Sequence, residues 1–395
     1  MLPHNICVIG GGRWARVIIG VLCDILPPGS CVNVLSYHNA EQMSAWISEH
    51  NYKLVIHVTS GESEFDLKKS DIVIIANAAH DHYKTAKHAL NLGLPVLVEK
   101  PLALSYRDCQ ELISIADHHK VGIALSQIFL FTRYFENFTK IVLAAGEIQQ
   151  IRFYWSDPKN ESRYGETKSY DSSLPIYFDL LPHILPLIGK LTSNNFEKSA
   201  KLQLLKGGAH INVDVIVGNV PCRIELVRNG QSRKRLIEVV TINGQIKLDF
   251  SSEPGIIRIG SKTINGDPDW LINQKPLGRM LNAFIKLVTV GEYDERLNID
   301  IAAKASKLID IVNASYQFMQ KSWLIKKVSV PGFQVDDEIR YALYEIFQSK
   351  EVLPKSFIEK AIDNFENQVV GNNINRQVIN ELINSQNFLN YFTDN

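Results

Sequence analysis

Strand-like and helix-like segments alternate along the first 126 residues, and this order limits the possible folds more than any other feature. The strand-like segments are six short apolar runs rich in β-branched residues, at residues 6–9, 31–35, 53–58, 71–76, 95–99 and 122–126. Runs that are apolar along their whole length indicate strands buried on both faces. The helices expected between them are longer amphipathic segments, at residues 13–26, 40–50, 81–92 and 105–119. Strands separated by helices need crossover connections, so the sequence predicts an α/β domain with a parallel, doubly wound sheet over residues 1–126.

The pattern changes to that of an antiparallel sheet after residue 126. Further strand-like runs follow one another with turns such as GG, RNG and NG between them, at residues 148–155, 200–207, 210–217, 222–228, 235–242 and 245–250. Turns of this composition join hairpins rather than crossovers. Two long helices are predicted next, over residues 277–288 and 299–319. We therefore expect a second, α+β domain over residues 127–330, with a largely antiparallel open sheet.

The last part of the chain differs again in its charge. From residue 331 onward, five basic residues stand against ten acidic ones, a net formal charge of −5. Apolar residues recur there at helical spacing, at Ile339, Leu343, Ile346 and Phe347 and again at Ile358, Ile362, Phe365 and Val369. This spacing predicts a helical C-terminal extension over residues 331–395 rather than a disordered tail. The sequence does not indicate what the extension does.

Composition excludes several classes of protein. Lys and Arg together number 42 and so do Asp and Glu, which leaves no overall field to attract nucleic acid or an acidic membrane. The five cysteines are odd in number and lack CxxC spacing, so neither a disulfide framework nor a metal site is expected. The start MLPHNICVIGG enters a strand at once and leaves no room for a signal peptide. We expect a cytoplasmic protein that acts on a small molecule, without a membrane span.

A glycine-rich turn follows the first predicted strand directly. The sequence GGGRWA, residues 10–15, has the GxGxxG/A pattern with alanine in the third small position, and it opens the first predicted helix. In this position Gly10 and Gly12 let the backbone approach a pyrophosphate, and the helix N-terminus supplies partial positive charge. The pattern is weak alone, and a ligand-free turn is its alternative. Its placement predicts a site for a nicotinamide dinucleotide.

The second predicted strand ends without the acidic residue that commonly binds the adenosine ribose of NAD. The sequence there is NVLSYHN, and no carboxylate comes before Glu41. A missing acid removes repulsion of a 2′-phosphate, while Ser36 and His38 offer hydrogen-bonding groups to it. NADP(H) is therefore favoured, and NAD(H) stays open because no arginine stands there either. A solvated loop is the alternative interpretation of His38.

Polar residues also follow the fourth and fifth predicted strands. ANAAHDH carries Asn77 and His80 after the fourth strand, and the fifth strand runs straight into Glu99, Lys100 and Pro101. Ligands of open parallel sheets bind outside the carboxyl ends of the strands. Lys100 stands at such an end, so we expect it to face a bound ligand.

Together, GGGRWA, the A-x-x-x-H-x-H segment and EKP resemble the Gfo/Idh/MocA family of NAD(P)-dependent oxidoreductases. The resemblance covers residues 5 to about 330 and implies that Lys100 lies against the nicotinamide and the reacting carbon of the substrate. It also implies a cis peptide bond before Pro101 and self-association through the open face of the second sheet, which makes a homodimer or homotetramer the expectation. The extension after residue 331 is not typical of the family.

The resemblance further predicts a D-x-x-x-H pair in the second domain, and the segment LPIYFDLLPHILPLIG supplies Asp179 and His183. Residues at i and i+4 share one helical face, and an ordinary structural salt bridge is the alternative interpretation. By resemblance, His183 exchanges a proton and Asp179 is its partner. Pro186 replaces a further aspartate of the family, and the two prolines of the segment predict a kinked or broken helix.

These features predict a set of site residues. The expected catalytic residues are Lys100, His183 and Asp179. The expected cofactor contacts are Gly10, Gly12, Arg13, Trp14, Ser36, His38, Asn77, His80, Glu99, Lys100 and Pro101. The expected substrate contacts are Gln127, Tyr134 and Tyr177.

The predicted function is an NAD(P)H-dependent oxidoreductase that moves a hydride between nicotinamide and a carbonyl or imine carbon. Lys100 and His183 are expected to handle charge and proton. Two alternatives remain. The apolar character of the Asp179 segment suits a reductase of a less polar imine in biosynthesis, such as a thiazolinyl intermediate. A non-catalytic dinucleotide-binding regulator or scaffold is the other, although such a protein needs none of the three catalytic residues.

Overall fold

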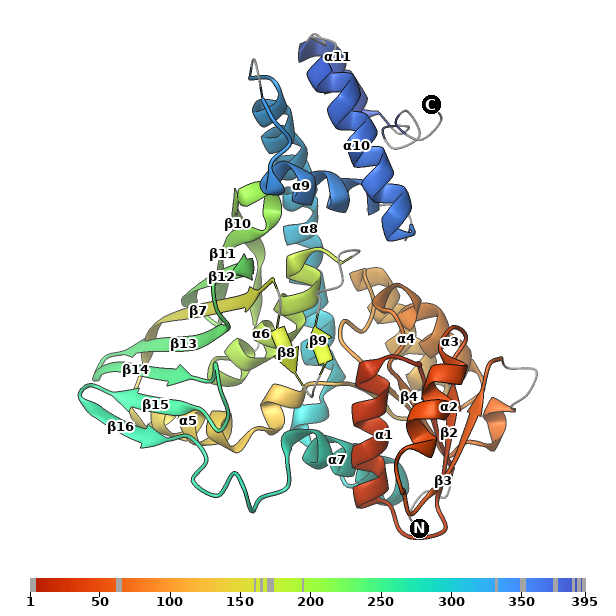
Figure 1. The fold of residues 1–395 in the computed structure, drawn as a ribbon. Coiled ribbons are helices and arrows are strands. Elements are labelled where there is room, and N and C mark those ends of the chain that lie inside the picture. Colours follow the sequence, from red (N-terminus) through yellow and green to blue (C-terminus); the bar gives the residue numbers. More distant parts are fainter. Residues whose placement is uncertain are drawn as a thin grey trace.

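The computed structural model describes residues 5–61, 66–159, 161–163, 166–168, 174–193, 195–330, 333–348, 353–371, 376–385, 388 and 392. Two sheets and a helical extension make up this part of the chain, as Figure 1 shows. The fold class predicted from the sequence is confirmed in all three parts.

The first sheet is parallel, with the strand order β3-β2-β1-β4-β5-β6. Its strands are β1 (Asn5–Ile9), β2 (Cys31–Leu35), β3 (Val55–Thr59), β4 (Ile72–Ile75), β5 (Val96–Val98) and β6 (Ile123–Leu125). The α-helices between them are α1 (Arg13–Ile25), α2 (Ala40–Ser48), α3 (His82–Asn91) and α4 (Tyr106–His119). Strand order reverses between β1 and β4, so the crevice at the carboxyl ends of these strands is a switch point, where doubly wound folds bind ligands.

The second sheet is largely antiparallel, with the order β10-β11-β12-β7-β13-β14-β15-β16, and β7 pairs with β12 in parallel. Its strands are β7 (Ile148–Pro158), β10 (Phe196–Leu205), β11 (His210–Val217), β12 (Val220–Gly230), β13 (Lys234–Thr241), β14 (Gly244–Asp249), β15 (Ile256–Ile259) and β16 (Lys262–Asn265). A short hairpin of β8 (Glu161–Arg163) and β9 (Glu166–Lys168) stands apart from it.

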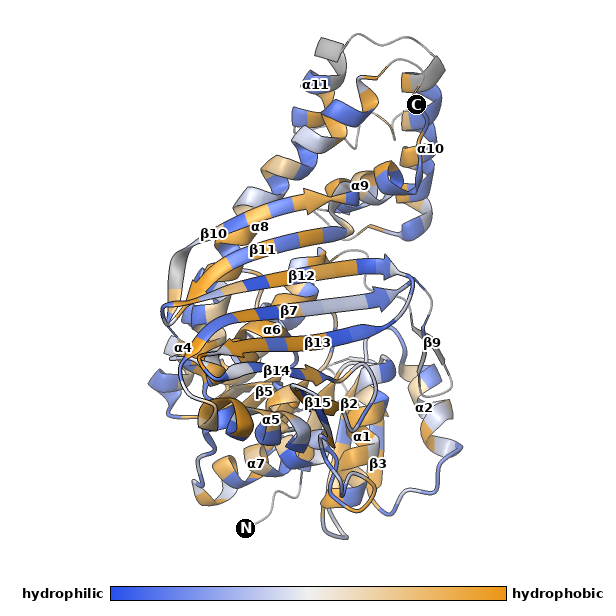
Figure 2. Cartoon of the chain, turned by 90° about the vertical axis from the view of Figure 1, so that its left-hand side faces the viewer, coloured by the Kyte–Doolittle hydropathy of each residue, from blue (hydrophilic) through white to orange (hydrophobic). Residues whose placement is uncertain are grey.

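Side chains alternate along the strands of the second sheet, which gives it one apolar face. In β11, Ile211, Val213 and Val215 are buried, whereas Asp214 and Ile216 between them are exposed. The helices α5 (Arg133–Ala144) and α6 (Ile176–Leu191) lie behind the strands in Figure 2 and cover the apolar face. The other face is open and mixes polar and apolar residues.

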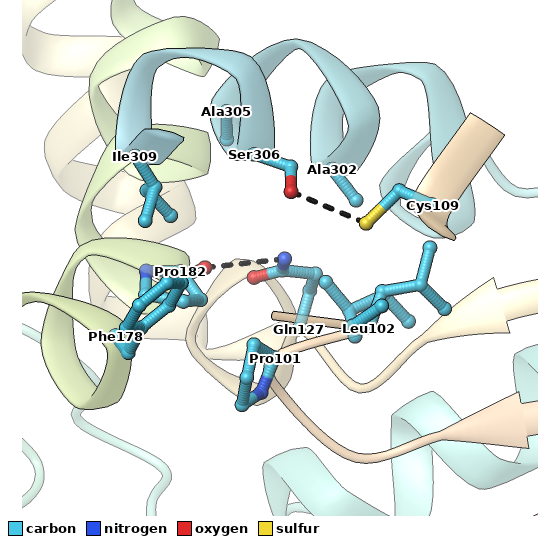
Figure 3. Close-up of a pocket in the computed structure, with 12 residues that line it drawn as sticks. Pro101, Leu102, Cys109, Gln127, Phe178, Pro182, Ala302, Ala305, Ser306 and Ile309 are labelled. Carbon is cyan, nitrogen blue, oxygen red and sulfur yellow. Dashed lines mark hydrogen bonds between the residues drawn. The ribbon is translucent and has the colours of Figure 1, made fainter. Parts of the chain in front are cut away.

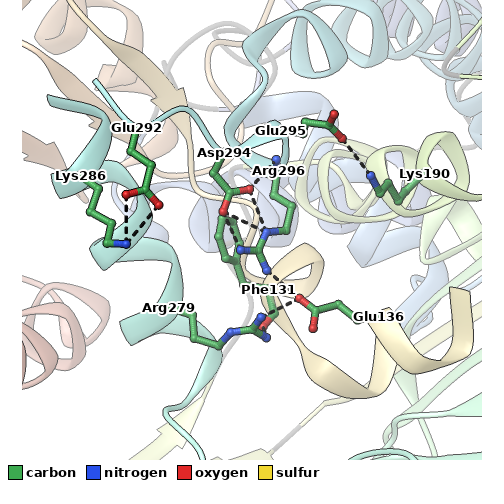
Figure 4. A network of polar contacts seen from close by, with 9 residues as sticks. All are labelled: Phe131, Glu136, Lys190, Arg279, Lys286, Glu292, Asp294, Glu295 and Arg296. Carbon is green, nitrogen blue, oxygen red and sulfur yellow. Dashed lines mark hydrogen bonds and ion pairs between the residues drawn. The ribbon is translucent and has the colours of Figure 1, made fainter. Parts of the chain in front are cut away.

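Two helices return from the second sheet to the first. Helix α7 (Pro276–Val290) packs beside α1, and the 30-residue helix α8 (Ile299–Val328) passes α4, α6 and β10 in turn. An ionic network holds their junction, where Glu136 accepts from Arg279 at 2.7 Å and from Arg296 at 2.6 Å (Figure 4). The network fixes the segment that leaves the first sheet against the two returning helices.

The extension is helical, as predicted, and has a core of its own. It comprises α9 (Asp337–Gln348), α10 (Lys355–Gly371) and α11 (Arg376–Asn384). Leu343, Phe347, Ile362 and Phe365 pack there with Leu324 of α8 in a cluster separate from the two domain cores. Helix α8 therefore packs against α4 and β6 near its start and joins the extension's core at its end.

Candidate active site

The glycine-rich turn between β1 and α1 leaves its backbone open to a ligand. Gly10 has a φ of +141°, and a Cβ there would lie 2.4 Å from the carbonyl oxygen of Ala76. Gly12 is exposed, directly precedes α1, and would place a Cβ in open space. These positions suit close approach of a pyrophosphate to the helix N-terminus. Arg13 and Trp14 follow in the first turn of α1, both half-buried.

Ser36 and His38 lie at the end of β2 but in different surroundings. Ser36 is 2% exposed, and its Oγ accepts from the backbone of Asn39 at 3.2 Å. A Cβ on Gly11 would lie 1.9 Å from that oxygen, so Ser36 packs directly against the glycine-rich turn. His38 is exposed.

A buried histidine joins the ends of β4 and β5. Nδ1 of His82 lies 2.7 Å from the carbonyl oxygen of Pro101, and its Nε2 lies 3.2 Å from that of Asn77. Burial lowers the pKa of His82, although both carbonyl contacts oppose that shift. The site residues predicted from the sequence include the neighbouring His80, which is half-buried in the turn before α3. They do not include His82, so the prediction missed its bridging role. The signal was the spacing H-x-H at the end of an apolar strand.

The EKP segment follows β5 directly and carries a cis bond between Lys100 and Pro101, as the family resemblance implied. Burial raises the pKa of the Glu99 carboxyl, while a hydrogen bond from Ser126 and the charge of Lys100 oppose the shift. Lys100 is half-buried, with 19% of its side chain exposed. The fixed bridge from His82 to Pro101 holds this segment at the carboxyl edge of the sheet.

Lys100 of the first domain meets Asp179 of the second. Nζ donates to Asp179 Oδ1 at 2.5 Å and to the Asp179 carbonyl oxygen at 3.1 Å. Asp179 lies in the first turn of α6, and 22% of its side chain is exposed. Two residues 79 positions apart thus converge from two domains, at a point that a small molecule can reach.

His183 lies one turn further along α6, among aromatic rings. Its ring is nearly parallel to that of Trp155, at an interplanar angle of 2° and a centroid distance of 5.8 Å. The ring of Phe129 stands edge-on to it at 5.1 Å. The Arg235 guanidinium lies 4.0 Å from the centre of the Trp155 ring. Flat apolar surfaces therefore border this histidine.

A second cation, Arg228, contacts Asp179 and was not among the site residues predicted from the sequence. Arg228 of β12 is 3% exposed, and its Nη2 lies 3.2 Å from Asp179 Oδ2. The two oxygens of Asp179 thus contact two different cations, which favours the carboxylate form. Alternation along β12 could have revealed Arg228, because Cys222, Ile224 and Leu226 precede it on the buried face.

Gln127 satisfies a carbonyl that a proline leaves free. Pro186 lacks the N–H that would bond the carbonyl of Pro182, and Gln127 Nε2 donates to that oxygen at 3.3 Å. Helix α6 consequently runs unbroken through both prolines, so the predicted break does not occur. Gln127 also lines a pocket with Pro101, Phe178 and Pro182, closed on its far side by α8 (Figure 3).

Two further tyrosines of the predicted set lie in the packed interior. Tyr134 is 1% exposed and packs against Phe250 and Trp270. Tyr177 is also 1% exposed, and its hydroxyl donates to Asn313 of α8 at 2.7 Å. Substrate contact by Gln127, Tyr134 and Tyr177 stays a prediction.

The described part of the chain shows neither a metal-binding cluster nor a helix that could span a membrane. No group of three or more His, Cys, Asp and Glu side chains there could hold a metal ion. None of the helices described combines the length and apolar character that crossing a membrane requires.

Comparison with known proteins agrees with this geometry. Residues 4–126 match the model of the oxidoreductase family with an NAD-binding Rossmann fold, Gfo/Idh/MocA. These residues form a Gfo/Idh/MocA domain. An uncharacterised oxidoreductase of Escherichia coli K12, YdgJ, is 25% identical to this chain over 189 residues. The match spans 46% of the chain and about half, 52%, of the bacterial protein.

Solved structures share the fold beyond the first domain. GenD2 from gentamicin A biosynthesis, in complex with NAD, has a TM-score of 0.64 and 15% identity, with 80% of this chain and 95% of GenD2 covered. Biliverdin reductase from Synechocystis sp. PCC 6803, in complex with biliverdin and NADP+, has a TM-score of 0.62 and 14% identity, with coverage of 79% and 98%. At these identities the likeness concerns the fold.

Proposed function

We propose that this Gfo/Idh/MocA chain is an NAD(P)H-dependent oxidoreductase acting on a carbonyl or imine carbon of a small molecule. The observation that carries the proposal is the contact between Lys100 Nζ and Asp179 Oδ1 at 2.5 Å, beside the carboxyl edge of the first sheet. The turn that holds Gly10 and Gly12 lies at the same edge, and the exposed Gly12 supports close approach of a dinucleotide there. A reduced nicotinamide held there supplies a hydride.

Side chains of this chain would then stabilise the developing charge and transfer the proton. The Lys100 ammonium is the proposed donor to the oxygen or nitrogen that gains charge, and its contacts with Asp179 support an orienting role for that residue. His183, one turn further along α6, is the proposed proton donor and acceptor. Positioned proton transfer of this kind contributes typically ~10²–10⁴-fold in rate.

The proposed cofactor is NADP(H) rather than NAD(H). Residues 36–40 offer no carboxylate to repel a 2′-phosphate, and the exposed His38 is available to donate to one. Relatives of the same fold have been crystallised with either cofactor, as the GenD2 and biliverdin reductase structures illustrate. A preference for NADPH is therefore a property to be measured on this chain.

The proposed substrate is less polar than a sugar. Trp155 and Phe129 surround His183, and Phe178 with Pro182 lines the pocket beside Pro101. The polar side chains beside the Trp155 ring, Arg235 and Asp157, pair with each other at 3.0 Å, so hydroxyl groups of a sugar would lose water with little replacement. A flat ketone or an imine of a biosynthetic intermediate fits this lining better.

The test combines binding with turnover. The purified chain is titrated with NADPH and NADH by fluorescence, and loss of reduced-nicotinamide absorbance is then followed against ketoses, apolar ketones and cyclic imines. We expect tighter binding of NADPH and turnover with an apolar ketone or imine. Tight binding without turnover on any of the three classes would instead favour the regulatory role. No binding of either dinucleotide would contradict both roles.

We also propose a homodimer or homotetramer that forms through the open face of the second sheet. Ile216 and Ile256 are 38% and 40% exposed on this sheet, among charged residues such as Arg223. Light scattering on the wild-type chain and on Ile216→Asp measures the state. A smaller mass for the variant supports the proposal, and a monomeric wild type contradicts it.

A further inference from the structure

A buried carboxylate in the C-terminal extension lies close to the candidate active site. Glu345 of α9 is 5% exposed. Its Oε1 accepts from the Tyr341 hydroxyl at 2.5 Å, and its Oε2 accepts from Gln320 Nε2 at 2.8 Å and from the Tyr316 hydroxyl. Residues of α8 and α9 therefore fix this carboxylate from several sides.

Arg228 connects Glu345 to Asp179. Its Nη1 lies 3.7 Å from Glu345 Oε1 and donates to the Leu174 carbonyl at 2.7 Å, while Nη2 contacts Asp179. Lys100, Asp179, Arg228 and Glu345 thus form a charge row with alternating signs, joined by contacts of 2.5, 3.2 and 3.7 Å. The row runs from the end of β5, through α6 and β12, to the extension.

We propose that Glu345 is a positioning residue for the active site, because it balances Arg228 and so leaves Asp179 available to hold Lys100. The extension, which the family's ordinary form lacks, would then complete the charge row rather than merely enlarge the protein. The effect of Glu345 on catalysis rests on the proposed function. The effect of Glu345 on the reactivity of Lys100 does not, and it can be measured without a substrate.

The balance of charges explains why Glu345 matters. The row holds two cations and two carboxylates, and the exposed fractions of Arg228 and Glu345 side chains are 2% and 3%. A buried charge without a counter-charge is costly, so Arg228 would draw more strongly on Asp179 if Glu345 were neutral. The pKa of Glu345 is raised above its ordinary value, chiefly by burial, although the Arg228 charge and the hydrogen bonds from Tyr316, Tyr341 and Gln320 act to lower it.

The experiment measures how readily Lys100 reacts with a small acylating reagent as pH is varied. The full chain is treated briefly with acetic anhydride, digested, and the modified fraction of the Lys100 peptide is determined by mass spectrometry. Glu345→Gln keeps the shape and removes the charge. The row then carries a net positive charge, so Lys100 loses its proton more readily and acylates faster. We expect a rate increase of about three- to tenfold at fixed pH, from a charge acting through an effective dielectric of about 20.

Matched variants separate charge from packing. Tyr316→Phe removes a hydrogen bond to Glu345 in the same cluster without changing the net charge, and we expect a change of less than about twofold. Glu359→Gln removes a carboxylate that pairs with Arg340 on the extension's surface, and it should leave Lys100 unchanged. Lys87 of α3, which pairs with Glu111 of α4, is the internal standard in every digest.

Folding is checked by thermal unfolding of each variant. If Glu345→Gln does not fold, Glu345→Asp replaces it, because a shorter side chain withdraws the carboxylate from Arg228 and predicts a smaller change of the same sign. Unchanged Lys100 reactivity in a folded variant overturns the proposal. An equal change in Tyr316→Phe does so too, since packing alone would then explain it.

Turnover gives an independent outcome. Once a substrate is known, Glu345→Gln should lower kcat and move the alkaline loss of activity to lower pH, with dinucleotide affinity retained. Altered Lys100 reactivity in a protein that turns over nothing would uphold the charge coupling and contradict only the proposed function. Unaltered reactivity in an active enzyme would do the reverse.

Discussion

Lys100 is the residue on which the proposed chemistry depends most directly. It extends from the end of β5 to Asp179, and 19% of its side chain remains exposed. Replacing it with alanine removes the ammonium but leaves the Gly10–Gly12 turn intact. We expect Lys100→Ala to lower turnover by at least ~10²-fold while the Kd for the dinucleotide changes little, as measured by fluorescence titration and steady-state kinetics. Lys87→Ala is the control, since that lysine pairs with Glu111 on the surface. Retained turnover in Lys100→Ala would refute its role.

The buried His82 should make the free energy of unfolding depend on pH. Burial lowers its pKa below the ordinary value of 6.5, so the unfolded chain takes up a proton before the folded one does. The free energy of unfolding should therefore fall as pH drops below 6.5, by at most about 1.4 kcal/mol per pH unit. Urea unfolding at several pH values measures this slope. His82→Gln should flatten it, whereas exposed His119→Gln should not.

Residue predictions succeeded where the signal was local. The geometry at Gly10 and the cis bond at Lys100 follow from short motifs next to strands. The contact of Arg228 with Asp179 depends on how β12 faces α6, a relation between segments far apart in sequence. Arg228 and Glu345 were therefore absent from the predicted set, although each interrupts an apolar buried face.

At the scale of elements, α6 tolerates its prolines because another segment supplies a donor. Gln127→Leu leaves the buried Pro182 carbonyl unsatisfied and should cost about 1–3 kcal/mol of stability. Pro186→Ala restores an N–H to that oxygen, so the cost of Gln127→Leu should shrink in this background. Urea unfolding of the two single variants and the double variant measures the coupling. Additive effects would show that Gln127 does not replace the missing donor.

The strands of the first sheet were predicted closely because they are continuous apolar runs, and its helices because they are amphipathic. The expectation of burial on both faces was wrong for β3, an edge strand in which Val55 is 55% exposed. The short strands β15 and β16, at four residues each, and helix α5 were not predicted. β15 and β16 have few residues in which to show alternation, and in α5 the aromatic Tyr134 was expected to contact the substrate rather than to belong to a packed helix. Tertiary packing decides such segments.

At the scale of the whole molecule, the extension has a core that is separate from those of the two domains. Phe365 is 1% exposed and packs with Phe388 and Phe392. Phe365→Ala should cost about 3–5 kcal/mol locally. Hydrogen exchange should then rise in α9, α10 and the end of α8, while β1 to β6 stay protected. Equal loss of protection in the first sheet would mean that the molecule unfolds as one unit.

The domain boundaries at residues 126 and 330 remain predictions, and α8 shows why the second is hard to define from sequence. This helix passes β6 and α4 near its start and carries Leu324 in the extension's core near its end. The composition changes at residue 331, whereas the shared core already includes Leu324.

The unbroken 30-residue α8 has a consequence for how such a chain can change over evolutionary time. Ser306 faces Cys109 near one end, and Tyr316 and Gln320 face Glu345 further on. One inserted residue between them would rotate everything downstream by about 100° and advance it by about 1.5 Å. Both sets of neighbours could not then be met at once, so lineages with this extension should keep the spacing from Ser306 to Tyr316 free of insertions and deletions even where the amino acids differ.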